Sequence, residues 1–134
     1  MISGASQAEF AILMLDGIKT NFLAGIDNRG QTKEHTQLLN SLGVRKLLCC
    51  VNKMDENNWN EEDYHFVVER FTNFINSQNF KNIESFQFIP IAALHGHNIT
   101  KSPHTAAPNS FWWKGYSLVQ MFDDLESKSL GIFI

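Results

Sequence analysis

The sequence lacks several features that mark common classes of protein. None of its apolar runs approaches the roughly 18 residues that a membrane-spanning helix needs. Its first residues, MISGASQAEF, contain no basic stretch leading into an apolar block, so we expect no signal peptide. Eleven basic and fourteen acidic side chains give a net charge of −3, which argues against unaided binding of nucleic-acid phosphates. We therefore expect no membrane association and no direct DNA binding.

Cysteine is also scarce. Cys49 and Cys50, the only two, are adjacent in an apolar run, and neighbouring side chains of a strand point to opposite faces of its sheet. A disulfide between them is therefore not expected. The low hydrophobicity and high net charge of disordered chains are absent as well, since 43% of the 134 residues are hydrophobic. These features predict one reduced, soluble, cytoplasmic domain.

Three short apolar runs predict strands buried on both faces. They cover residues 10–15, 47–51 and 86–91, and each is too short and too uniformly apolar for an amphipathic helix. Segments with helical spacing of apolar residues follow each run. This alternation predicts an α/β fold with a parallel sheet and crossover helices.

The predicted helices differ in the strength of their signals. The first, over residues 32–42, is followed by Gly43, which favours a helix end. The second begins after Asn60, a capping residue, and a short third helix covers residues 118–125. The residues at helical spacing are His35, Leu38, Leu39 and Leu42 in the first helix, and Tyr64, Val67, Val68, Phe71, Phe74 and Ile75 in the second.

A long irregular stretch, residues 94–116, separates the last strand from the last helix. It contains two prolines and the cluster Phe111-Trp112-Trp113. Loops of this length are often functional or docked onto another surface. We favour the alternative that the aromatic side chains pack the loop against the protein's own core.

Polar residues directly after the second and third strands predict a binding site for guanine. Ligands of open parallel sheets bind at the carboxyl ends of the strands. Asp55 offers two coplanar oxygens that match the N1–H and 2-amino donors of guanine, and adenine lacks this pair of donors. The aliphatic part of Lys53 can lie along the flat base, and Asn52 can tie neighbouring loops together by side-chain hydrogen bonds. Backbone N–H groups of residues 92–94 can reach the guanine carbonyl oxygen.

These residues carry a resemblance to a known family. The stretches MISGASQAEFAILMLDG, GQTKEHTQLLNSLGV, LLCCVNKMDENNW and FIPIAALHGHNI resemble the C-terminal part of the G domain of translational GTPases. The similarity is to the group of elongation factor 1-alpha, the eukaryotic class II release factor and the ribosome-rescue GTPase that works with Pelota. It implies a three-layer, P-loop GTPase-type sheet of which residues 1–125 form the C-terminal half, with a divergent tail at residues 126–134.

The resemblance assigns roles to individual residues. Asn52, Lys53 and Asp55 match the guanine-specificity motif of the family. Residues Ala92, Ala93 and Leu94 match its second base-contacting loop, where the family usually has Ser-Gly followed by Trp or Leu. Ala92 therefore lacks the hydroxyl often found there, whereas a backbone N–H contact from Ala93 is independent of the side chain.

The resemblance also implies which parts are missing. The phosphate-binding loop, the first switch and the Asp-x-x-Gly magnesium element of the family all lie upstream of Met1. We therefore expect the cofactor to be GTP or GDP, with Mg²⁺ and GTP hydrolysis only in the full-length protein, of which this chain is a fragment. Without the neighbouring strand, residues 10–15 are expected to form an exposed apolar edge that promotes aggregation.

Other candidate sites are weaker. Residues 25–32 have the glycine spacing of a P-loop, but Gln31 replaces the lysine that binds phosphates, and the Asp-x-x-Gly pattern within them follows no apolar strand. His95, His97 and His104 have no cysteine nearby to support a zinc site. We assign no catalytic residue and no metal ligand in this chain.

Two functions remain open from the sequence. The first is a GTP-binding translation factor for elongation, termination or ribosome rescue, whose partners are the ribosome and a tRNA or tRNA-like factor. The alternative is a truncated, non-enzymatic interaction module that binds no nucleotide. Thermal stabilisation by GDP or GTP distinguishes them.

Overall fold

The fold is a parallel sheet covered by helices, seen in a computed structural model of the chain. The model describes residues 10–99, 110, 112–113, 115, 117–120 and 131–133. The strands are β1 (Phe10–Asp16), β2 (Lys46–Asn52), β3 (Ser85–Pro90) and β4 (Gly131–Phe133). They form one sheet in the order β3-β2-β1-β4, and every neighbouring pair is parallel. This confirms the predicted α/β class and the positions of the three predicted strands. The predicted burial on both faces is wrong for β3, which lies at the edge of the sheet and has an exposed Gln87.

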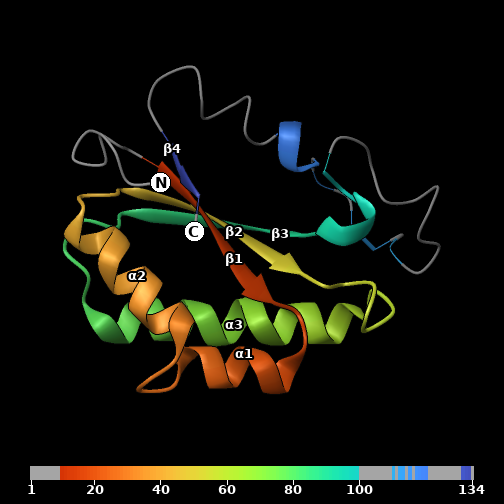
Figure 1. The fold of residues 1–134 in the computed structure, drawn as a ribbon, viewed down its shortest axis with the longest axis horizontal. Helices are drawn as coiled ribbons and strands as arrows, with labels where there is room; N and C mark the ends of the chain where they lie inside the picture. Colours follow the sequence, from red (N-terminus) through yellow and green to blue (C-terminus); the bar gives the residue numbers. More distant parts are fainter. Residues whose placement is uncertain are drawn as a thin grey trace.

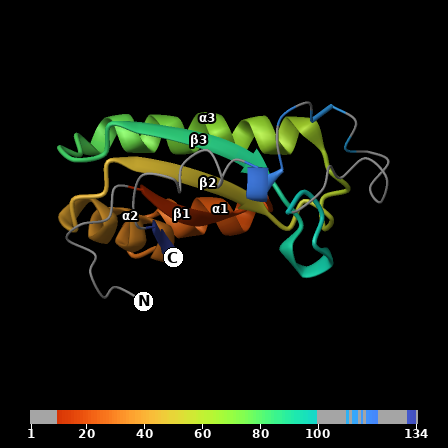
Figure 2. The same ribbon diagram turned by 90° about the horizontal axis from the view of Figure 1, so that it is seen from above.

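Three α-helices lie on the same face of the sheet (Figure 1). They are α1 (Lys19–Ile26), α2 (Gln31–Ser41) and α3 (Glu61–Gln78). Figure 2 shows α3 running along β3, with α1 near β1. In the part of the chain that is described, no helix is both long and apolar enough to cross a membrane.

Helix α3 forms as its sequence predicts. The Asn60 side chain accepts a hydrogen bond from the Asp63 N–H at 3.0 Å, and three acidic residues occupy the first turn, where the helix dipole favours negative charge. Trp59 and Tyr64 are both in the core, and the Trp112 ring contacts each of them. The buried residues of the helix are Tyr64, Val67, Phe71, Phe74 and Ile75.

Alternation along β2 divides the core into two parts. Leu47, Cys49 and Val51 face the helices, whereas Leu48 and Cys50 belong to a smaller cluster with Ile89 and Ile91 on the other face. The two thiols therefore lie on opposite faces and are free, as predicted. Ile99, Trp113 and Leu118 pack against the smaller cluster.

The described tryptophans of the long loop pack against the core. Trp112 donates from Nε1 to the carbonyl oxygen of Trp59 at 2.6 Å, and the Trp113 ring lies 6.0 Å from that of Tyr64. This confirms the interpretation for Trp112 and Trp113, which hold their part of the loop on the protein's own core. Phe111 and residues 100–109 lie outside the described part.

The prediction of an exposed apolar edge at residues 10–15 is wrong for residues 10–12, which pair with β4, whereas residues 13–15 have no β4 partner in the described register. β4 pairs with β1 in parallel, with Ala11 opposite Ile132. Most of β1 is buried, and Met14 is its one residue with an exposed side chain, at 39%. β4 lies within the predicted tail, whose residues 126–130 are outside the described part.

The helices also differ from expectation in places. Helix α1 was not predicted, because it has no side-chain cap and buries only Phe22. In α2, Leu39 is buried, but Leu38 is exposed, so the predicted apolar stripe is too wide. Gly43 follows α2 with φ of 84°, which confirms the predicted helix end. Residues 118–120 are helical, and the rest of the predicted third helix lies outside the described part.

Candidate guanine-binding site

The predicted site lies beyond the carboxyl ends of β1, β2 and β3. The turn after β2 and the 3-10 helix η2 (Ala93–His95) both lie beyond the arrowheads of these strands (Figure 1). The strand ends are joined closely, because the Gly17 N–H donates to the Asn52 carbonyl oxygen at 2.8 Å. The Met54 N–H donates to the Ile91 carbonyl oxygen at 3.1 Å. The sheet therefore fixes where both loops begin.

Asn52 connects the two loops of the predicted site. Its Oδ1 accepts a hydrogen bond from the backbone N–H of Ala93 at 2.9 Å. This confirms the predicted side-chain tie between the loops. The N–H of Ala92 donates to the His97 carbonyl oxygen, so both of these N–H groups already have protein partners. Leu94, the third residue of this loop, is 89% exposed.

Lys53 stands beside a cavity at the ends of β1 and β2. Its Nζ lies 3.1 Å from Oδ2 of Asp16, and this hydrogen bond and the negative charge raise the pKa of Lys53 above its ordinary value. The cavity measures about 160 Å³. Its lining residues are Met14, Leu15, Asp16, Asn52 and Lys53.

Asp55 lies on the tight turn that leads from β2 to α3. Lys53 has φ of 63°, a left-handed conformation that turns the chain sharply at the end of the strand. The Trp59 N–H donates to the Met54 carbonyl oxygen at 2.7 Å, which closes the turn around Asp55. The Asp55 side chain is 25% exposed, and its Oδ2 lies 3.2 Å from Nε2 of His95.

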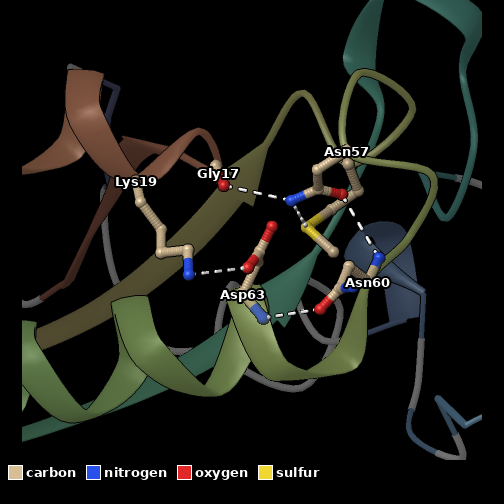
Figure 3. A network of polar contacts seen from close by, with 6 residues as sticks. Gly17, Lys19, Asn57, Asn60 and Asp63 are labelled. Carbon is tan, nitrogen blue, oxygen red and sulfur yellow. Dashed lines mark hydrogen bonds and ion pairs between the residues drawn. The ribbon is translucent and has the colours of Figure 1, made fainter.

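Asn57 holds this turn against the end of β1. Its Nδ2 donates to the Gly17 carbonyl oxygen at 3.0 Å, and its Oδ1 accepts from the Asn60 N–H at 3.3 Å. Figure 3 shows these contacts together with the ion pair of Lys19 with Asp63, at 3.2 Å. One network therefore links the end of β1, the turn and the first turn of α3.

Sequence reasoning missed two of these supporting residues. Asn57 was not given a role, although its position near a cap residue favours backbone hydrogen bonds. His95 was considered only as a metal ligand, but it contacts Asp55 and stacks on His97 with 5.5 Å between ring centroids. His104 lies outside the described part, within which no group of three or more potential metal ligands gathers. Residues 27–30, in the P-loop-like stretch, connect α1 and α2.

Comparisons with known proteins identify relatives of this chain. The family model of the elongation factor Tu GTP-binding domain matches residues 1–128. Elongation factor 1-alpha of Serendipita indica is 44% identical over 117 residues, which are 87% of this chain and 24% of that protein. Elongation factor 1-alpha of Ignicoccus hospitalis is 38% identical over 132 residues, which are 97% of this chain and 29% of that protein. The chain therefore spans about a quarter of the length of these curated relatives.

Solved structures of Sup35 have the same fold. Sup35 complexed with GDP superimposes with a TM-score of 0.79 and 30% sequence identity, covering 93% of this chain and 31% of that chain. Sup35 complexed with GMPPNP gives a TM-score of 0.78 and 31% identity, with coverage of 90% and 30%. The match extends over nearly all of this chain and about a third of either Sup35 chain.

Proposed function

This chain belongs to the elongation factor Tu GTP-binding domain family, and from this premise we propose that residues 52–55 and 92–94 form the guanine-binding part of a translational GTPase. The observation that carries the proposal is the 2.9 Å hydrogen bond between Asn52 Oδ1 and the Ala93 N–H. It holds together two loops that are far apart in the sequence and that each offer groups to one base.

Each residue has a role that its chemistry supports. Asp55 accepts hydrogen bonds from N1–H and the 2-amino group of guanine, a pattern that adenine does not present. The carbon chain of Lys53 lies along the flat face of the base. Since Ala93 N–H already donates to Asn52, it is shared with the guanine carbonyl oxygen, and the N–H of Leu94 is the adjacent donor.

For the whole protein, we propose GTP binding and hydrolysis in translation. The support is similarity to elongation factor 1-alpha and to Sup35, whose solved structures are described as complexes with GDP and GMPPNP. The same similarity supports ribosome contact, and the proposal includes delivery of a tRNA or tRNA-like factor and a cytoplasmic location. Mg²⁺, when bound, neutralises phosphate charge during phosphoryl transfer. No described residue is assigned to it, because no potential metal cluster occurs in the described part.

Replacing Asp55 by Asn tests the proposal directly. The amide cannot accept both guanine donors, but it can donate to the 2-carbonyl of xanthine. We expect Asp55→Asn to lower affinity for GDP by about 30-fold, in line with a lost hydrogen bond to a charged group, and to favour xanthosine diphosphate. The measurement is an NMR titration of the 134-residue chain, with nucleotide concentrations extending to the millimolar range.

The control for this titration is Glu56→Gln. It removes a neighbouring, exposed carboxylate from the same turn and is expected to keep the preference for GDP. An unchanged GDP preference in Asp55→Asn would show that Asp55 does not read the base. A folded wild-type chain that binds neither GDP nor GTP would support the non-enzymatic interaction module instead.

A further inference from the structure

His95 contacts the carboxylate that the proposed function assigns to guanine. Its Nε2 lies 3.2 Å from Oδ2 of Asp55, and the exposed fractions of the two side chains are 51% and 25%. His95 belongs to η2, directly after the proposed base-contacting residues. The contact therefore joins the two halves of the proposed site a second time, in addition to the hydrogen bond of Asn52 with Ala93.

The contact with His95 can orient the Asp55 carboxylate for base binding. Asp55 must present two oxygens in the plane of the base, and a side chain on a turn loses rotational freedom when it does so. A carboxylate has about four lone-pair positions, so one donor from the imidazole leaves enough for the two guanine donors. The Nε2–H of His95 is present in the imidazolium and in one neutral tautomer. It can therefore restrict the carboxylate without blocking it.

The imidazole is itself held on a well-supported loop. Ala92 and His97 exchange two backbone hydrogen bonds, both 3.1 Å long, at the base of η2. The His97 ring stacks on His95 with an interplanar angle of 30° and lies 6.4 Å from the ring of the buried Trp59. Although the His95 side chain is half exposed, these contacts hold its ring so that Nε2 faces Asp55.

We propose that His95 is a positioning residue that orients the Asp55 carboxylate and so sets selectivity for the 2-amino group of guanine. This inference rests on the proposed function. The inference predicts different effects on guanine and hypoxanthine nucleotides, because hypoxanthine has N1–H but lacks the 2-amino group. Loss of orientation affects the second hydrogen bond most, so guanine loses more affinity than hypoxanthine.

The test compares GDP with inosine diphosphate on the full 134-residue chain. We expect His95→Ala to reduce the ratio of GDP affinity to inosine diphosphate affinity by about threefold, as suits a partly exposed pair. His95→Gln, which retains an N–H donor of similar reach, is expected to restore the ratio. His65→Ala is the matched control, since His65 makes an exposed 3.2 Å contact with Glu61 on α3 and should leave the ratio unchanged.

The outcomes separate this inference from the proposed function. If the wild-type chain binds no guanine nucleotide, both are overturned. If it binds GDP but His95→Ala leaves the ratio unchanged, or lowers both affinities equally, only the positioning role is overturned. Failure of His95→Gln to restore a ratio lost in His95→Ala would also contradict it.

Discussion

Asparagine side chains act in place of backbone at three positions around the site. Asn52 accepts from the Ala93 N–H, Asn57 donates to the Gly17 carbonyl and Asn60 accepts from the Asp63 N–H. Loops leave backbone groups without the partners that a helix or strand provides, and short amides can supply them. The shape of the site thus depends on residues that do not themselves contact the proposed base.

At Gly17 the ends of β1 and β2 approach so closely that there is no room for a side chain. A Cβ on Gly17 would lie 2.6 Å from the Asn52 carbonyl oxygen, which is backbone and cannot easily move. We expect Gly17→Ala to lower the free energy of unfolding by about 2–3 kcal/mol, in the upper part of the range of about 1–3 kcal/mol for overpacking. Urea unfolding measures this value.

Gly43 provides the control for this substitution. A Cβ there meets nothing within 4 Å, although φ of 84° makes the conformation unfavourable for alanine. Gly43→Ala should therefore cost about 1 kcal/mol. If the Gly17→Ala protein were as stable as the Gly43→Ala protein, the ends of β1 and β2 could move apart at little cost in stability.

At the scale of elements, the two buried thiols of β2 make the free energy of unfolding decrease at alkaline pH. Burial raises the pKa of Cys50 from its ordinary value of 9.0 to about 12, and burial, followed by the neighbouring Cys50, raises that of Cys49. The unfolded chain therefore loses these protons first. Their stabilising contribution is complete below pH 9 and is lost as pH rises above it.

We expect the free energy of unfolding to fall above about pH 9, by up to about 1.4 kcal/mol per pH unit for each thiol. Urea unfolding between pH 7 and 10.5 measures the slope. Cys50→Ala removes one of the two thiols and should give a shallower slope than wild type. An equal slope in the two proteins would mean that Cys50 does not titrate on unfolding.

The elements that could be predicted from sequence are those with strong local signals. β1 and β2 each contain an apolar run of five or more residues, β3 is mostly apolar, and α3 has a cap, acidic first-turn residues and a long apolar stripe. α1 has none of these, and β4 is a three-residue strand that forms only by non-local pairing. In the site, the proximity of Asn52 and Ala93 could be predicted, because both follow the ends of neighbouring strands. The contact of His95 with Asp55 could not, because it depends on the left-handed conformations of Lys53 and Gly96.

For the whole molecule, the outer edge of β1 is one place where the sheet can pair with another copy, and β4 covers part of it. β4 pairs with Phe10, Ala11 and Ile12 in parallel register. Unpaired strand edges expose backbone N–H and C=O groups that pair readily with other chains. Although the buried side chains of β1 are apolar, its backbone edge is the part that β4 covers.

Deleting residues 131–134 is therefore expected to increase aggregation. The lost backbone hydrogen bonds should lower the free energy of unfolding by about 1–3 kcal/mol, and the uncovered edge should raise light scattering as protein concentration increases. Deletion of Ile134 alone is the control, because it leaves the three paired residues of β4 in place. If the longer deletion left both stability and scattering unchanged, β4 would not protect this edge.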